Sequence, residues 1–287
     1  MGLETVSPYV RLALDSYVAY PWLIRERQLW DYEILYLQQG RLRVIVEDRE
    51  YEGEPGDIFV FRPRVRHTIA LVGEQTVRQP HVHFDLNQLP DSAEVGISFV
   101  TEAAMGDRER GWFRADALAA AGVDLPERLR LRNPLVFEKL LHDLIAEFRL
   151  KMPFYELNLK GMLVKLLIHI MREHHWAKTP HVGGRITELL RVQAYLNHQT
   201  GREVSLDDLS ATFNWSKYYL TRLFKSAFGM SPIHYHQLVR LERAKELIRF
   251  TTYSMTEIAD MVGFPNIHAF SRAFKAKEGV PPSAYRR

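Results

Sequence analysis

Residues 254–279 read SMTEIADMVGFPNIHAFSRAFKAKEG, and a related stretch, SLDDLSATFNWSKYYLTRLFKSAFG, occupies residues 205–229. The two stretches share apolar, basic and glycine positions fifty residues apart, namely Leu220 and Phe270, Arg222 and Arg272, Phe224 and Phe274, Lys225 and Lys275, and Gly229 and Gly279. Self-similarity at a fixed spacing indicates one supersecondary unit used twice.

Each copy predicts a short helix, a tight turn and a second helix. The four predicted helices follow side chains that favour helix N-caps: Ser205, Ser216, Ser254 and Asn266. Gly263 in the second turn readily takes positive φ, and Asn214 is the tolerated substitute in the first turn. The sequence therefore predicts two helix-turn-helix motifs, at about residues 205–229 and 254–279.

The second helix of each motif separates apolar from polar side chains. The predicted core side chains are Leu220, Leu223, Phe224, Ala227, Phe270, Ala273 and Phe274. The side chains expected to point outward are Lys217, Tyr218, Thr221, Arg222, Lys225, Ile267, His268, Ser271, Arg272 and Lys275. A face rich in Arg, Lys, Ser and His suits the major groove of DNA, and its appearance twice favours that interpretation over a merely solvated helix.

A third predicted helix joins the two motifs, beginning at Ser231 and Pro232. Its roughly 18 residues span about 27 Å. Successive major-groove faces on one side of a DNA duplex lie ~34 Å apart. We therefore expect that one chain can read two adjacent grooves.

Charge is distributed unevenly along the 287 residues, whose formal net charge is +3. Residues 185–287 carry 15 Lys and Arg against 9 Asp and Glu, which leaves 23 against 26 for the rest of the chain. A basic excess at one end suggests that this end meets a polyanion.

The length predicts about two domains, and the pattern along the chain indicates an α+β protein. We expect a β-barrel of the cupin or jelly-roll kind over residues 1–132, because short β-rich runs alternate with turn residues there. Apolar spacing of three and four residues predicts a helical hairpin over 133–177. Its surplus apolar face packs either on the barrel or on a second subunit. Residues 178–184 are expected to be a linker, and 185–287 an all-helical domain.

Several classes of protein are excluded. The chain has no cysteine, so disulfides, zinc–thiolate sites and thiol nucleophiles are impossible. A DNA-repair protein that accepts alkyl groups is also excluded, because its chemistry needs a thiolate. The first ten residues lack the apolar core of a secretory signal, and no apolar run approaches the ~20 residues of a membrane span. We expect a cytoplasmic protein that does not enter the membrane.

The last hundred residues resemble the AraC/XylS family of bacterial transcription regulators. The resemblance rests on YSMTEIADMVGF at 253–264, FSRAFK at 270–275, Gly279 and PSAYR at 282–286. It implies promoter DNA and RNA polymerase as partners, and it implies base-contacting roles for Tyr218, Thr221, Arg222, Ile267, His268, Ser271 and Arg272. Ile267 stands where the family often has a polar residue, so a thymine methyl group is its expected contact.

The front of the chain resembles the cupin-like sensor domain of sugar-responsive members of that family. The matching segments are DYEILY at 31–36, PGDI at 55–58, His67 and HVHFD at 81–85. The resemblance implies a small effector, often a sugar, inside the barrel and a hairpin that dimerises the protein. Our candidates for effector binding are Arg25, Arg27, Trp30, Glu33, His67, His81 and His83.

A metal-dependent cupin enzyme, an isomerase or a dioxygenase with an accessory helical domain, is the alternative. His67, His81 and His83 with Glu33 are ligand types that suit zinc, iron or manganese. Residues 32–37, however, lack the His-x-His pattern that metal cupins normally carry there. We therefore expect no enzyme activity, no cofactor and no metal, and we expect the histidines to hydrogen bond to an effector or to one another.

Overall fold

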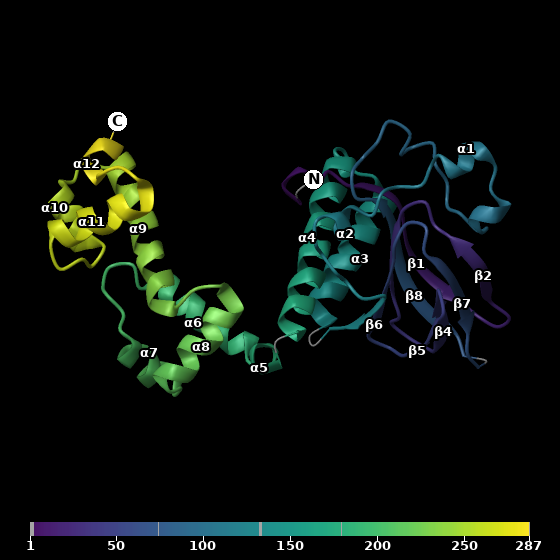
Figure 1. The fold of residues 1–287 in the computed structure, drawn as a ribbon, viewed down its shortest axis with the longest axis horizontal. Coiled ribbons are helices and arrows are strands. Elements are labelled where there is room, and N and C mark those ends of the chain that lie inside the picture. The colour runs from purple at the N-terminus through teal and green to yellow at the C-terminus, as the bar shows by residue number, and fades with distance from the viewer. Residues whose placement is uncertain (1–2, 74, 132–133, 179, 287) are drawn as a thin grey trace. The chain divides into compact units, whose positions relative to one another are not determined.

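The computed structural model describes residues 3–73, 75–131, 134–178 and 180–286. The chain forms two compact units, Met1–His175 and Trp176–Arg287 (Figure 1). Residue 133, where the predicted hairpin begins, and residue 179 of the predicted linker lie outside the described residues. Within those four ranges, no helix is both long enough and apolar enough to cross a membrane.

The N-terminal unit is built on two antiparallel sheets, as the cupin-like prediction requires. The first sheet has the order β1 (Tyr9–Val18), β8 (Val77–Asp85), β3 (Tyr32–Tyr36), β6 (Asp57–Phe61) and β9 (Arg128–Arg130). The second has the order β2 (Leu23–Gln28), β7 (Arg66–Leu71), β4 (Leu42–Val46) and β5 (Arg49–Gly53).

The central strand β3 is buried at every residue because both faces of its sheet are covered. Alternate side chains point to opposite faces of a strand. Ile34 therefore joins the core beneath the helices, and Leu35 joins the core between the two sheets. The face of β3 that carries Glu33 and Leu35 therefore points into the interior between the two sheets.

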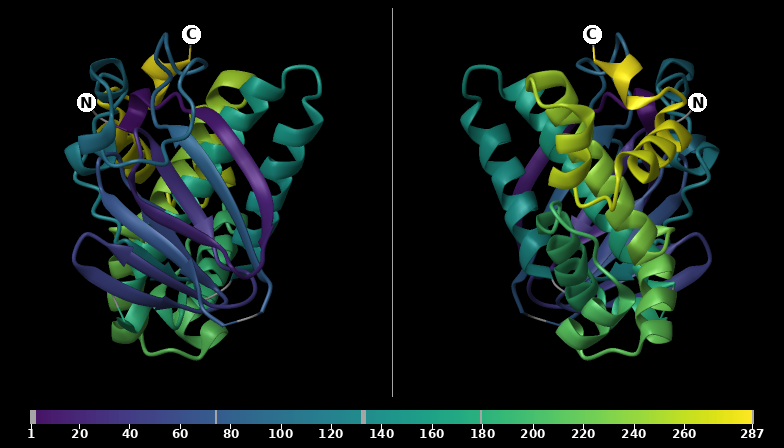
Figure 2. Two further views of the ribbon diagram at one scale, coloured as in Figure 1. Left: turned by 90° about the vertical axis from the view of Figure 1, so that its right-hand side faces the viewer. Right: turned by 90° about the vertical axis from the view of Figure 1, so that its left-hand side faces the viewer.

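The predicted hairpin is present as α3 (Pro134–Leu150) and α4 (Tyr155–Ala177), an antiparallel pair that Figure 2 shows in teal. Its apolar stripe packs on the five-stranded sheet, and the buried members are Phe137, Leu141, Leu144, Leu159, Leu163, Leu166, Leu167 and Ile170. Of the two alternatives for this stripe, packing on the barrel is the one observed. Around the turn, Leu150, Met152, Phe154 and Leu157 remain exposed.

Short helical elements complete the N-terminal unit. They are η1 (Leu3–Thr5), η2 (Glu102–Ala104), α1 (Asp107–Arg110) and α2 (Ala117–Ala120). In α2, the Asp116 carboxylate accepts a hydrogen bond from the backbone N–H of Ala119 and so caps the helix. Leu118 then packs into the core beneath the hairpin, which fixes part of the 106–125 segment to the barrel.

The C-terminal unit is all helical, as predicted. Its helices are α5 (Pro180–Gly183), α6 (Ile186–His198), α7 (Leu206–Phe213), α8 (Lys217–Phe228), α9 (Pro232–Phe250), α10 (Met255–Met261), α11 (Ile267–Glu278) and α12 (Pro282–Tyr285). The described part of residues 178–184 differs from the expected linker. It contains α5, and Val182 is fully buried in the core of this unit, so this segment belongs to the helical domain.

Both helix-turn-helix motifs form where the repeat places them. Ser205 and Ser254 each accept a hydrogen bond from the third residue of the helix that they cap, in capping boxes with Asp208 and Glu257. Asn214 has φ 54° and Gly263 has φ 69°, so both turns use the left-handed region as expected. Each motif has its own apolar core, and α9 runs from one to the other (Figure 1).

Candidate functional site: two exposed helix faces and a buried polar cluster

The outward face of α8 carries basic and aromatic side chains. Tyr218 is 76% exposed, and the guanidinium carbon of Arg222 lies 5.8 Å from its ring centroid. Lys217 Nζ lies 2.5 Å from Asp207 Oδ1, and Lys225 is exposed one turn beyond Arg222. The opposite face is buried because Leu220, Leu223 and Phe224 pack into the motif core.

The outward face of α11 repeats this arrangement. His268, Arg272 and Lys275 are exposed, and Phe270 and Phe274 are fully buried behind them. Arg272 and Lys275 occupy the positions in α11 that Arg222 and Lys225 occupy in α8. Each face therefore offers a fork-shaped guanidinium and an ammonium group one turn apart, which suit base edges and phosphates.

Three of the predicted contact residues are less exposed than the sequence suggests. Thr221, Ile267 and Ser271 are half-buried. The Thr221 hydroxyl oxygen is buried and has no hydrogen-bond partner among the described residues. Ile267, the first residue of α11, packs against the core of its own motif because helix side chains lean toward the N-terminal end. Three of the ten side chains expected to point outward are therefore only partly exposed.

Sequence reasoning missed Arg240 in the middle of α9. Its side chain is almost fully buried, its Nη1 donates to the Gly263 carbonyl oxygen at 2.7 Å, and its guanidinium carbon lies 4.5 Å from the Phe264 ring centroid. These contacts attach the turn of the second motif to the connecting helix. An arginine within an amphipathic helix is usually solvated, so this role could not be predicted from the spacing of residues in α9.

Inside the N-terminal unit, two cross-strand pairs face each other. Glu33 on β3 is paired with His83 on β8, and Arg27 on β2 is paired with His67 on β7. Each of these four residues is at most 2% exposed. His81, two residues before His83 on the same face of β8, is half-buried and forms the outer edge of the cluster. The two sheets therefore bring together five of the seven predicted effector-binding residues.

Arg27 is the centre of this cluster. Its Nη2 lies 2.6 Å from Glu33 Oε2, and its Nε donates to His67 Nε2 at 2.9 Å. The Nδ1 atom of His67 lies 3.1 Å from the Val65 carbonyl oxygen, so the proton of a neutral ring belongs on Nδ1. The ring of His67 also stacks on Phe61, with centroids 4.2 Å apart.

The environment sets the charge of each group. Burial alone would raise the pKa of Glu33, but the neighbouring His83, Arg27, His81 and His67 lower that pKa to about 2. Burial first, and then the charge of Arg27, lower the pKa of His67 to about 4. Burial also lowers the pKa of His81. At neutral pH the cluster therefore contains an ionised Glu33 and neutral rings at His67 and His81.

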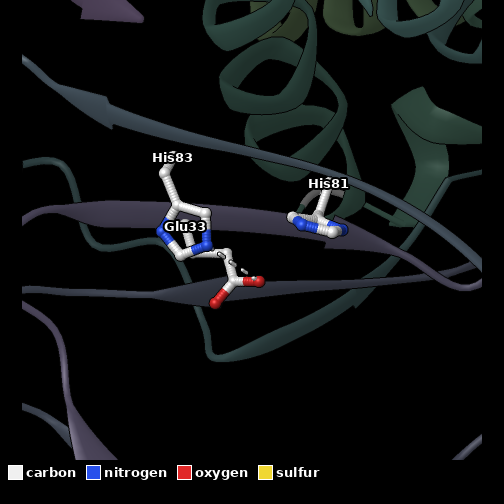
Figure 3. A group of neighbouring side chains, drawn as sticks. All are labelled: Glu33, His81 and His83. Atoms are coloured by element: carbon white, nitrogen blue, oxygen red, sulfur yellow. Dashed lines mark ion pairs between the residues drawn. The ribbon is translucent and has the colours of Figure 1, made fainter. Parts of the chain in front are cut away.

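The position of His83 differs from that of the other two imidazoles. Its Nε2 lies 3.5 Å from Glu33 Oε1, and its Nδ1 lies 3.6 Å from Asp31 Oδ1 (Figure 3 shows the Glu33 pair). Both distances exceed an ordinary hydrogen bond, and Nδ1 has no hydrogen-bond partner among the described residues. His83 is thus held between two carboxylates without closing on either.

Beyond His83, a further layer of buried ion pairs holds the carboxylates. Arg11 Nε lies 2.7 Å from Asp31 Oδ2, and Arg11 Nη2 lies 2.8 Å from Asp85 Oδ2. Arg114 adds contacts of 3.0 Å to Asp85 and 2.9 Å to Asp91. Sequence reasoning gave Arg11 and Arg114 no role, although a lone arginine in the apolar run YVRLAL at 9–14 was a signal.

Two predicted effector-binding residues lie away from the cluster. Arg25 is exposed because the register between β2 and β7 shifts between Ile24 and Arg27, which turns the intervening residues outward. Trp30 packs edge-on against Trp112, with ring centroids 5.1 Å apart, in a separate small core with Val95 and Met105.

Comparisons with known proteins agree with both halves of the chain. A family model described as an AraC-like ligand binding domain matches residues 21–104, and a helix-turn-helix domain model matches residues 209–287. The HTH-type transcriptional regulator YisR of Bacillus subtilis (strain 168) is 23% identical over 256 residues, which cover 89% of this chain and 85% of that protein.

Two further similarities are partial. The raffinose operon transcriptional regulatory protein RafR of Pediococcus pentosaceus is 32% identical over 130 residues, covering 45% of this chain and 47% of that protein. Among solved structures, the C-terminal domain of AraT, a response regulator from Geobacillus stearothermophilus, is 36% identical and covers 34% of this chain and 83% of that chain, with a TM-score of 0.34.

The families and relatives are transcriptional regulators, so the alternative of a cupin enzyme with an accessory helical domain is not retained. The order of the two matched domains is the order of the two structural units, a ligand-binding sheet domain followed by a helical DNA-binding domain. This chain therefore belongs to the AraC family of helix-turn-helix transcriptional regulators.

Proposed function

We propose that this regulator binds promoter DNA by placing α8 and α11 in two successive major grooves and that a small effector in the barrel domain controls this binding. The observation that supports the DNA part best is the repeated exposed face, with Arg222 and Lys225 matched by Arg272 and Lys275. The 19 residues of α9 span about 28 Å, which is close to the spacing of successive grooves.

Within each face, the exposed residues divide by chemistry. Arg222 and Arg272 are the proposed readers of base edges, because a guanidinium bonds guanine at two atoms. The lysines at 217, 225 and 275 are proposed to bind phosphates, and Tyr218 and His268 are proposed to contact bases or sugars beside the arginines. The half-buried Thr221, Ser271 and Ile267 are proposed to make closer contacts at the edges of the two faces.

Substitution of Arg272 tests this proposal in a fluorescence anisotropy titration with DNA from the promoter that the regulator controls. Arg272→Ala is expected to weaken binding by about 5- to 150-fold, since loss of a bidentate base contact costs about 1–3 kcal/mol. Arg191→Ala is the matched control, because Arg191 is exposed on α6, outside both recognition helices. Equal affinity of the two variants would refute the role of α11.

For the effector, we propose a sugar or a sugar derivative bound at the cluster of Arg27, Glu33, His67, His81 and His83. Carboxylate, imidazole and guanidinium groups complement the hydroxyl groups of a polyol. The similarity to a regulatory protein of a raffinose operon favours an effector related to sugars. A thermal-shift screen against neutral sugars and uronic acids tests it, because a ligand of the folded barrel raises its melting temperature. If no member of the panel shifts melting, the sugar assignment is abandoned.

We further propose that the regulator is a cytoplasmic homodimer, joined at the turn of the hairpin, that acts together with RNA polymerase. Leu150, Met152, Phe154 and Leu157 are all more than half exposed around this turn. A cluster of exposed apolar side chains favours protein association. A second copy of the chain would cover this patch and would also double the number of recognition helices presented to the promoter.

A further inference from the structure

Three side chains in the barrel combine into a set that the DNA-binding function does not use. Glu33 comes from β3, and His81 and His83 come from β8 (Figure 3). One ligand atom from each residue lies within 4.8 Å of the other two. Two imidazoles and a carboxylate are typical ligand groups of a divalent transition metal.

The second nitrogen of His81 is hydrogen bonded to a backbone oxygen, whereas that of His83 faces a carboxylate at a longer distance. His81 Nδ1 lies 3.1 Å from the Gln79 carbonyl oxygen, and His83 Nδ1 lies 3.6 Å from Asp31 Oδ1. His81 is therefore oriented as metal-binding histidines usually are, with the outer N–H directed to a carbonyl oxygen. For His81 this leaves Nε2 as the nitrogen with a free lone pair, and the Nε2 atom of His83 faces the Glu33 carboxylate.

The two oxygen atoms of the Glu33 carboxylate have different neighbours. Oε2 lies 2.6 Å from Arg27, which fixes the orientation of the side chain. Oε1 faces His83 Nε2 at 3.5 Å. Two ligand atoms that each lie ~2.1 Å from one tetrahedral metal are about 3.4 Å apart. The observed separation is too long for a good hydrogen bond but matches a shared ion.

The ring of His83 is not closely hydrogen bonded to the two carboxylates that face it. A buried imidazole normally has hydrogen-bond partners, yet both carboxylates stand more than 3.4 Å from its nitrogens. Arg11 holds Asp31 at 2.7 Å, and Arg27 holds Glu33, so neither carboxylate is positioned for a direct bond to the ring. An ion bound to Glu33 Oε1 and His83 Nε2 would occupy the gap of 3.5 Å between these two atoms.

We propose that Glu33, His81 and His83 bind one divalent transition-metal ion inside the barrel. Nitrogen ligands favour ions such as Zn²⁺, Co²⁺ or Fe²⁺ over Mg²⁺ and Ca²⁺. Three protein ligands leave at least one coordination position for water or for an oxygen atom of the effector. The proposal concerns the effector site of the proposed function but does not depend on the DNA-binding part.

This site differs from the sequence expectation of no metal. That expectation rests on the missing His-x-His in residues 32–37, whereas the His-x-His of this chain lies on β8. The register that sets Glu33 opposite His83 brings the two strands together, and periodicity alone does not give a register.

Cobalt titration of the full-length protein, stripped with a chelator and dialysed, tests the proposal. We expect visible absorption bands that saturate at one Co²⁺ per chain. These bands should disappear when one equivalent of Zn²⁺ is added, because Zn²⁺ displaces Co²⁺. Millimolar Mg²⁺ should not displace the bound Co²⁺. His81→Gln is expected to weaken Co²⁺ binding at least tenfold. Because His81 is half-buried at the edge of the cluster, this variant keeps the core of the barrel intact.

His234→Gln is the matched control, since His234 is exposed on α9 in the other structural unit, and it should bind Co²⁺ like the unaltered protein. Less than a tenth of an equivalent of bound cobalt would overturn the proposal. Equal binding by the His81→Gln variant would also overturn it, because the ion would then lie elsewhere. The assay contains no DNA, so a negative result leaves promoter binding by α8 and α11 standing, and failure of the promoter titration leaves the metal site standing.

Discussion

At the scale of single residues, Gly263 fixes the turn of the second helix-turn-helix. Its φ is +69°, and a Cβ atom there would lie 2.5 Å from the Cα of Arg202. Arg202 precedes the first motif, so the close approach joins the two motifs of the DNA-binding unit. Gly229 ends α8 with a similar φ of +78°, but a Cβ atom there would meet nothing within 4 Å.

Alanine substitution at the two glycines distinguishes the cost of backbone strain from the cost of steric overlap. Gly229→Ala is expected to lower the free energy of unfolding by about 1 kcal/mol, the cost of placing a side chain in the left-handed region. Gly263→Ala is expected to cost about 2–4 kcal/mol, because overlap with backbone atoms adds to the same strain. Urea denaturation followed by circular dichroism measures both. Equal losses in the two variants would show that the contact with Arg202 does not constrain the turn.

His236 on α9 makes the DNA-binding unit sensitive to acid. Its ring is buried, its Nε2–H donates to the Gln199 carbonyl oxygen at 2.7 Å, and Arg240 and Arg202 lie nearby while Glu203 opposes them. Burial is the main cause that lowers the pKa of His236 below its ordinary value. The unfolded chain therefore binds a proton more tightly, so the His236 contribution to stability is present above about pH 6.5 and is lost as the pH falls.

Replacing His236 should reduce this acid sensitivity. His236→Gln keeps an N–H donor for Gln199 but cannot be protonated, so its melting temperature should fall less between pH 7.5 and pH 5.5 than that of the unaltered protein. His234→Gln, an exposed neighbour on the same helix, should keep the original pH dependence. Thermal melts across this range decide the matter, and parallel curves for the two variants would contradict the assignment.

At the scale of helices and strands, the repeat made the DNA-binding unit predictable. Caps, turn residues and apolar spacing all lie within a few residues of each other, so Ser254, Gly263 and Phe270 could be placed from local rules alone. The sheet unit was harder to predict from the sequence. Strand runs were visible, but the pairing of Glu33 with His83 and of Arg27 with His67 depends on register across distant segments. The bulge that turns Arg25 outward is equally invisible in a single sequence.

Local rules also failed where a helix meets its neighbours. Ile267 and Thr221 sit on the polar side of their helices by spacing, yet packing against adjacent elements half-buries them. The predicted linker failed for a similar reason, because Val182 is buried by helices distant in sequence. Burial at element edges is a tertiary property, and it is there that the sequence predictions were least accurate.

The hairpin α3–α4 carries the proposed dimer contact, and Phe154 is its most exposed apolar side chain at 84%. Phe154→Asp is expected to shift the protein from dimer to monomer in sedimentation velocity at micromolar concentration, because a charge replaces buried apolar area at the interface. Phe250→Asp provides a matched control, since Phe250 is 83% exposed at the end of α9. An unchanged sedimentation coefficient for the Phe154 variant would place the dimer contact elsewhere.

At the scale of the whole molecule, the chain separates sensing from DNA reading. The N-terminal unit contains the buried polar cluster and the C-terminal unit contains both recognition faces, each with its own apolar core. Control by an effector then requires that the effector bind the DNA-competent and DNA-incompetent states with different affinities. An effector that binds both states equally leaves promoter affinity unchanged.

Hydroxyl-radical footprinting on promoter DNA tests the central claim most directly, because it maps each recognition helix separately. The unaltered protein should protect two segments on one face of the duplex, centred about one helical turn apart. Arg222→Ala should lose protection of one segment and Arg272→Ala protection of the other. A single protected segment, or loss of the same segment in both variants, would contradict the proposal that α8 and α11 read two successive grooves.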